Sequence, residues 1–340
     1  MTVRPRVVVS KCLEFAACRY DGQMINDPVV ALLKEQVEFL PVCAECEIGL
    51  GVPREPIRLV QQGNMLQVLQ PATGRDATAA MLAFCRTFMA DQHDLDGFLL
   101  KSKSPSCGVG DVRIYPSVGK VAALGRGRGI FGGAARESFP DLAIEDEARL
   151  SNYRIREHYF TRLWASARLR AARAAGTMRA LVKFHADHKL LLLAHSEKEM
   201  RLLGKIVANP ARRPLPALWD EYAAGLARAL ANPARLTAMI NVLQHAFGHV
   251  TDRVRAAERR HFLAQVEKYR TGKLPLSAVT ALLAALVVRF EVAYLADQTF
   301  FAPYPEQLML ITDSGKGARC DAGGYSAANS GRGSDCLRTV

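Results

Sequence analysis

The chain has 340 residues and is 49% hydrophobic, which is enough apolar material to fill folded cores. Its formal net charge is +12, but residues 1–150 contain 17 Lys and Arg against 18 Asp and Glu, and the remainder contains 28 against 15. The length and this unequal division of charge predict two domains, of which the second is strongly basic.

Membrane insertion, export and a disulfide framework are all disfavoured by the sequence. The most apolar uncharged run, Pro275–Val288, has 14 residues and is too short to span a bilayer. No cleavable apolar leader begins the chain, because Arg4 and Arg6 run directly into a strand-like segment. We therefore expect a cytoplasmic protein with no membrane partner, in which the eight cysteines are reduced thiols for catalysis or metal binding.

The first half alternates strand and helix patterns, which predicts an α/β domain over residues 1–150 with a mainly parallel sheet. We predict helices at residues 28–35 and 76–90, and strands at residues 6–10, 37–42, 57–62, 65–70, 97–101 and 142–144. Gly63-Asn64 separates two of these strands and indicates a hairpin.

After residue 150 the apolar period changes to 3.6, which predicts a basic, all-helical domain over residues 151–312. Breaks are expected at Pro210, Pro214, Pro216, Pro233 and Pro275. Residues 313–340 are rich in Gly, Ser, Ala and Asn, and we expect a disordered tail there, which makes Cys320 and Cys336 poor ligands.

Three cysteines follow predicted strands: Cys12 after residues 6–10, Cys43 after residues 37–42, and Cys107 after residues 97–101. The carboxyl ends of neighbouring parallel strands meet at one crevice, so the three segments are expected to form one site. Thiolates gathered in this way suit a soft metal. By contrast, Cys85 lies beside Leu82 and Phe88 in an apolar helix, where a buried cysteine is favoured.

The kind of metal stays open on the residues alone. A structural zinc site normally uses two close cysteine pairs, and only Cys43 and Cys46 have that spacing. An iron-sulfur cluster accepts widely separated ligands, and one held by three thiolates leaves an iron free for a substrate atom. Glu45 is then a candidate proton carrier beside the metal, or else a solvated glutamate at a strand end.

Five segments together resemble the signature motifs of the 2-thiouracil desulfurase family. They are Ser10–Leu13, Cys18–Gly22, Pro41–Glu45, Gly49–Arg54 and Leu100–Gly108. The resemblance implies a 4Fe-4S cluster held by Cys12, Cys43 and Cys107, whose fourth iron captures a thione sulfur. It also implies that Glu45 handles protons. The helical half looks like an uncharacterised domain that is often fused to such modules, so the natural substrate stays open.

The leading hypothesis is therefore an iron-sulfur-dependent desulfurase that converts a thiolated pyrimidine, or a related thioamide, into its oxygen analogue and hydrosulfide. Glu45 is expected to activate water, and Ser104 and Ser106 to hydrogen-bond the heterocycle. Cys18 and Cys46 are interpreted either as competing ligands or as thiols that take sulfur during turnover. The alternative is a nucleic-acid-binding or redox-sensing protein with a structural or regulatory cluster.

Weaker patterns lie elsewhere. Gly127–Gly132 fits G-x-G-x-x-G, but no strand of a βαβ unit precedes it, so a loop that opens a helix is favoured over a dinucleotide site. The histidines are read as ordinary residues or as a second metal site: His185, His188, His195, His245 and His249. The residues around 153–170 are read as an RNA-facing stripe or as a solvated face that packs through its aromatics: Tyr153, Arg154, Arg156, Tyr159, Arg162, Trp164, Arg168 and Arg170.

Overall fold

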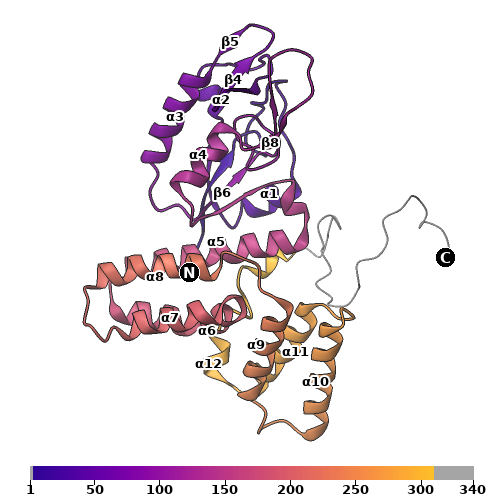
Figure 1. Ribbon diagram of the computed structural model, residues 1–340. Coiled ribbons are helices and arrows are strands. Elements are labelled where there is room, and N and C mark those ends of the chain that lie inside the picture. The colour runs from indigo at the N-terminus through magenta and orange to yellow at the C-terminus, as the bar shows by residue number, and fades with distance from the viewer. Residues whose placement is uncertain (1–2, 310–340) are drawn as a thin grey trace, which may run out of the picture.

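The computed structural model describes residues 3–309, in which an α/β region precedes a helical region (Figure 1). The α/β region contains four helices, α1 (Pro28–Leu33), α2 (Ala44–Glu47), α3 (Thr78–Ala90) and α4 (Ile130–Ser138). Its strands are β1 (Arg6–Ser10), β2 (Glu38–Val42), β3 (Arg58–Gln62), β4 (Met65–Gln70), β5 (Arg75–Asp76), β6 (Gly97–Leu100), β7 (Val112–Tyr115), β8 (Gly125–Gly127) and β9 (Ala143–Asp146).

Sheet A has four parallel strands in the order β2-β1-β6-β9. Val7, Val8 and Val9 are all buried, because both faces of a parallel sheet are covered and its strands are accordingly apolar throughout. The prediction of a mainly parallel sheet in an α/β region is confirmed.

A second sheet has the order β5-β4-β3-β7-β8, with only β3 and β7 parallel. The predicted hairpin is present, since β3 and β4 are antiparallel and Gln62 pairs with Met65 across Gly63-Asn64. Strands β5, β7 and β8 were not predicted, because they have only two to four residues and β8 includes two glycines. This sheet packs with α3 and α4 against one face of sheet A.

The rest of the described chain is helical, as predicted. Its helices are α5 (Tyr153–Ala174), α6 (Met178–His195), α7 (Glu197–Ala208), α8 (Leu215–Ala229), α9 (Leu236–Gly248), α10 (Ala256–Arg270), α11 (Leu276–Arg289) and α12 (Ala293–Ala296), with short 3₁₀ turns at Arg149–Ser151 and Glu306–Leu308. Helices end or begin beside the predicted proline breaks. The predicted tail at residues 313–340, with Cys320 and Cys336, lies outside the described residues.

Helix α5 lies between the two regions and contributes to both cores (Figure 1). Its Tyr159 hydroxyl donates to the carbonyl oxygen of Phe98 in β6 at 3.1 Å. The approach is close at Gly97, where a Cβ atom would lie 2.5 Å from both a Leu163 methyl and the Ala143 carbonyl oxygen. Glycine is therefore required there for the helix to cover the sheet.

Residues 299–309, which we call the C-terminal strap, return from the helical region to α5. The Arg168 guanidinium donates to the carbonyl oxygens of Ala302 and Pro303 at 3.0 and 2.8 Å. Tyr304 and Leu308 are buried in the same core as β1 and β6. The last described residues thus complete the core beneath sheet A.

Candidate functional site

The carboxyl ends of β1, β2 and β6 open into one cavity of about 430 Å³. Its wall includes four cysteines, one glutamate and four serines: Cys12, Cys18, Cys43, Cys107, Glu45, Ser10, Ser102, Ser104 and Ser106. The backbone N–H of Lys11 donates to Val42 O at 2.8 Å, and that of Lys101 donates to Ser10 Oγ at 2.9 Å. These bonds fix the three strand ends beside one another, so the three predicted segments do meet.

The thiols crowd one another, and several are buried. Burial raises the pKa of Cys107 to about 12. Contact with the Cys12 thiol is the largest cause that raises the pKa of Cys18 to about 11. Contact with Cys18, and then burial, raise the pKa of Cys43 well above its ordinary value. The cavity therefore favours neutral thiols until a cation joins them, and a thiol-binding metal supplies that charge.

The metal-binding atoms that the cavity wall offers are mainly the sulfur atoms of its four cysteines. Within residues 3–309, no three His, Cys, Asp or Glu side chains are close enough to hold a single metal ion. Cys46 lies outside the lining, and its Sγ donates to Cys18 O at 3.9 Å. Cys43 Sγ donates to the same oxygen at 3.8 Å. The donor set thus suits a thiophilic centre that fills the cavity.

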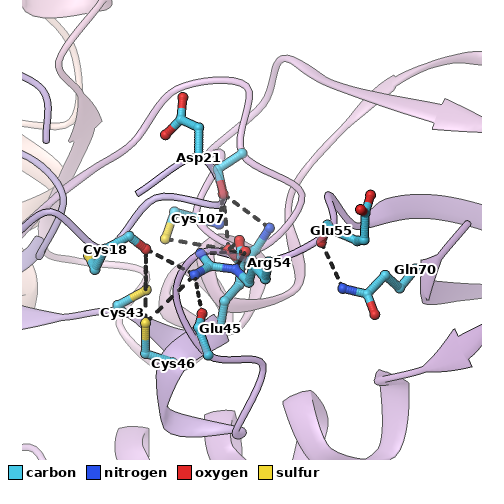
Figure 2. A network of polar contacts seen from close by, with 12 residues as sticks. Cys18, Asp21, Cys43, Glu45, Cys46, Arg54, Glu55, Gln70 and Cys107 are labelled. Atoms are coloured by element: carbon cyan, nitrogen blue, oxygen red, sulfur yellow. Dashed lines mark hydrogen bonds and ion pairs between the residues drawn. The ribbon is translucent and has the colours of Figure 1, made fainter. Parts of the chain in front are cut away.

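Glu45 is held at the cavity by a buried arginine. It lies in α2, two residues after Cys43, and is 9% exposed. Arg54 Nε and Nη2 both lie 2.8 Å from Glu45 Oε2. Figure 2 shows this arginine among Glu45, Cys18 and Cys46, and its Nη1 also donates to Cys18 O at 3.0 Å and to Gly51 O at 2.8 Å. One guanidinium therefore joins three of the segments that form the site.

Two serines extend from the other oxygen of Glu45. Ser106 Oγ donates to Glu45 Oε1 at 2.7 Å, and Ser104 Oγ lies 2.9 Å from Ser106 Oγ. Ser104 Oγ also accepts the backbone N–H groups of Ser106 and Cys107 at 3.3 and 3.1 Å. Since it already accepts twice, its own proton is directed to Ser106. The two hydroxyls therefore form an ordered chain from Ser104 to the carboxylate.

The Cys107 loop rests on the start of α4. A Cβ atom at Gly132 would lie 2.5 Å from the carbonyl oxygens of both Cys107 and Gly108. The N–H of Gly132 donates to Ser106 O at 3.0 Å, and that of Gly129 donates to Gly108 O at 2.8 Å. The G-x-G-x-x-G segment thus opens a helix, as favoured from the sequence, and its glycines allow the helix to support Cys107 closely.

The cavity wall is predominantly positive. It carries one carboxylate, Glu45, and the side chains of Lys11, Arg19, Arg54, Lys101 and Lys103. Lys101 is neutralised by Glu147 at 2.6 Å and Arg19 by Asp21 at 3.5 Å. Lys11 and Lys103 have no carboxylate partner among the described residues. The wall therefore favours anions.

All five predicted site residues line this cavity: Cys12, Cys43, Cys107, Glu45 and Ser104. Cys18 lines it too, and Cys85 is buried in α3 as predicted. The sequence analysis assigned no role to Arg54. The one available signal was its position in the Gly49–Arg54 segment, because the contacts that reveal its function join residues far apart in the sequence.

The prediction of an RNA-facing stripe on α5 is wrong. Arg156, Tyr159 and Trp164 are each 2% exposed. The guanidinium of Arg162 donates to Leu142 O at 2.9 Å, and that of Arg170 lies 2.8 Å from Asp96 Oδ2. These side chains attach α5 to the sheet and its loops, because this helix is covered on both sides. Periodicity alone does not reveal such double coverage.

The histidines do not converge either. His185 Nδ1 lies 3.0 Å from the Tyr222 hydroxyl, and His195 Nδ1 lies 3.0 Å from Asn232 O. His188 is buried against Phe184. The rings of His245 and His249 meet edge-on at the end of α9, near Tyr294 of α12. Ordinary packing, the other interpretation, accounts for these residues.

Comparison with known families divides the chain in the same way as its sequence patterns. Residues 7–147 match the family model described as 2-thiouracil desulfurase. They belong to the 2-thiouracil desulfurase family. Residues 189–305 match the model of DUF1722, a protein of unknown function. The chain is therefore a fusion of a desulfurase-family region and a DUF1722 region, as the resemblance implied.

Individual relatives cover parts of the chain. An uncharacterized protein of Escherichia coli (strain K12), YbgA, is 30% identical over 151 residues, which are 44% of this chain and 89% of that protein. An uncharacterized protein of Bacillus subtilis (strain 168), YbbK, is 29% identical over 112 residues, which are 31% of this chain and 74% of that protein. The solved [4Fe-4S]-dependent thiouracil desulfidase TudS is 29% identical, covers 43% of this chain and 93% of its own, and has a TM-score of 0.35. Within residues 3–309, no helix combines the length and apolar character needed to cross a membrane.

Proposed function

We propose that this chain removes sulfur from a thiolated pyrimidine or a related thioamide. The carbon–sulfur bond breaks, a carbon–oxygen bond forms with water, and sulfur leaves as hydrosulfide without a net transfer of electrons. One observation carries the proposal: Cys12, Cys43 and Cys107 converge from three strand ends on one cavity, beside Glu45, in a region of the 2-thiouracil desulfurase family.

We assign Cys12, Cys43 and Cys107 as the ligands of a 4Fe-4S cluster. The soft donor set and the raised thiol pKa values support a thiophilic, positively charged centre in this cavity. When bound through three thiolates, the cluster supplies an iron that polarises a thione by taking up its soft sulfur. Cys18 lies in the same cavity and would be the competing thiol ligand.

Glu45 is the proton acceptor for the attacking water. Arg54 holds it through Oε2, which leaves Oε1 directed to Ser106. The ordered hydroxyls of Ser106 and Ser104 connect this oxygen to the cavity wall, so a proton reaches or leaves the carboxylate along them. The positive wall then stabilises the negative charge that develops on the departing sulfur.

The test is anaerobic reconstitution with iron and sulfide, followed by incubation with 2-thiouracil. We expect uracil and hydrosulfide in equal amounts, and loss of the cluster on replacing Cys12, Cys43 or Cys107 by Ala. Cys85→Ala is the matched control, since Cys85 is buried in α3 away from the cavity lining. A cluster with four protein ligands that releases no sulfide would indicate the redox-sensing alternative.

A thiolated nucleoside within RNA accounts for the charge of the second half of the chain, and we include RNA contact in the proposal. The excess of 28 basic over 15 acidic residues after residue 150 supports it. The affinity for a thiolated transfer RNA fragment is expected to fall as the salt concentration rises, and the plot of log affinity against log salt concentration is expected to be linear. Salt-independent binding, or none at low salt, contradicts this part.

A further inference from the structure

Tyr20 is an aromatic side chain on the cavity wall that takes no part in the folded cores. Among the described residues that line the cavity it is the one aromatic ring. The residue is 44% exposed, and it belongs to none of the four hydrophobic clusters. Within residues 3–309 its hydroxyl has no hydrogen-bond partner. Neither packing nor a polar contact therefore accounts for a tyrosine here.

The backbone around Tyr20 is fixed. Its carbonyl oxygen accepts the N–H of Arg54 at 2.8 Å, and the N–H of Gly22 closes a turn on Arg19 O at 3.0 Å. Gly22 has a φ of +71°, which glycine adopts without strain. The ring is thus carried by a tight turn that is attached to the same arginine as Glu45.

One face of the ring is already covered. The Arg19 guanidinium lies over it, 5.6 Å from the ring centroid, and Asp21 holds that guanidinium at 3.5 Å. A cation over one face orders an exposed aromatic ring. The remaining ring surface is open to a planar ligand, and the apolar side chains of Val42, Pro56, Ile57 and Pro105 also line the cavity.

We propose that Tyr20 is the surface on which the heterocycle of the substrate stacks. It makes the chain selective for planar thiolated rings over open-chain thioamides, an inference that rests on the proposed function. A pyrimidine offers a full aromatic face, whereas a small open-chain thioamide offers little area to stack. Both kinds of compound carry a thiocarbonyl group, so reaction at sulfur does not distinguish them. Stacking on the ring of Tyr20 therefore supplies the selectivity for planar rings.

The experiment compares wild type, Tyr20→Leu and Tyr20→Phe as anaerobically purified full chains. Equilibrium dialysis with uracil measures ring binding without desulfuration. We expect Tyr20→Leu to weaken uracil binding about five- to tenfold and Tyr20→Phe to restore it. The matched control is Tyr294→Leu, since Tyr294 is 36% exposed and lies outside the cavity lining.

Turnover gives a second measurement. The ratio of kcat/KM for 2-thiouracil to kcat/KM for thioacetamide is expected to fall about five- to tenfold in Tyr20→Leu, through KM rather than kcat. Unchanged uracil binding in Tyr20→Leu, or no uracil binding by wild type, would overturn the role of Tyr20. Uracil binding that depends on Tyr20 without sulfide release by wild type would instead refute only the desulfurase proposal.

Discussion

Arg54 contacts one oxygen of Glu45 twice, through Nε and Nη2 at 2.8 Å each, and thereby leaves the second oxygen to Ser106. This contact fixes the orientation of the carboxylate. A bidentate guanidinium has planar geometry that lysine cannot reproduce. The position of Glu45 in the cavity therefore depends on a residue that lies nine positions along the chain.

Arg54→Gln is expected to lower kcat/KM for 2-thiouracil about 100-fold, since Glu45 loses its buried ion pair. Arg54→Lys keeps the charge and is expected to recover only part of the loss. Arg75→Gln is the control, because Arg75 is exposed and contacts the same stretch at Gly49 O. Steady-state rates, measured by sulfide detection, test this prediction. Equal activity of Arg54→Gln and Arg75→Gln would contradict the role of Arg54 in holding Glu45.

Ser106→Ala removes the hydroxyl that joins Glu45 to Ser104. We expect kcat to fall about 100-fold while iron content stays unchanged, because a proton route is lost and no proposed ligand is altered. Ser117→Ala, at an exposed position of the same region, controls for the loss of a hydroxyl. Iron and sulfide analysis beside the kinetics separates the two effects, and parallel loss of iron and activity would count against a proton role.

Gly132→Ala is expected to displace the Cys107 loop, because its Cβ would lie 2.5 Å from two carbonyl oxygens. Overpacking of this kind costs about 1–3 kcal/mol. The neighbouring Gly133→Ala is the control, since its Cβ would meet only the Arg128 Cβ at 3.7 Å. Denaturant unfolding and bound iron after reconstitution are the measurements. Both variants behaving alike would show that the close approach is unimportant.

His188 predicts how stability responds to acid. Burial is the largest cause that lowers its pKa to about 3. The folded pKa lies below the ordinary value, so protonation favours the unfolded chain. The contribution of neutral His188 to the free energy of unfolding is complete above about pH 6.5 and is lost as the pH falls toward 3. The free energy of unfolding then changes by at most about 1.4 kcal/mol per pH unit because of this residue.

His188→Leu is expected to flatten this dependence in denaturant unfolding measured from pH 7 to pH 4. The substitution also removes a buried nitrogen, Nε2, that has no hydrogen-bond partner. His261→Leu is the control, because His261 is exposed on α10. The same slope in wild type and His188→Leu would assign the acid sensitivity to other groups.

The apolar runs of β1, β2 and β6 were enough to predict a parallel sheet and to place Cys12, Cys43 and Cys107 at one edge. This succeeded because strand ends and their neighbours are encoded locally. Arg54 could not be assigned in the same way, since its partners come from three separate segments. Long-range hydrogen bonds leave no periodic pattern in a sequence.

The arginines of α5 show a second limit of prediction from the sequence. Their spacing indicates a polar face equally well when that face meets solvent and when it meets carbonyl oxygens of a neighbouring element. In the structure Arg162 and Arg168 serve as donors to the backbone. Charge alone therefore did not distinguish a surface for RNA from a buried attachment.

The C-terminal strap has a consequence for biosynthesis. Tyr304 and Leu308 complete the core that also contains Leu13, the residue after Cys12. A ribosome delivers the N-terminal strands first, yet this core stays incomplete until residue 308 has left the exit tunnel. The segment that carries Cys12 therefore gains its full support only after the helical region has been translated.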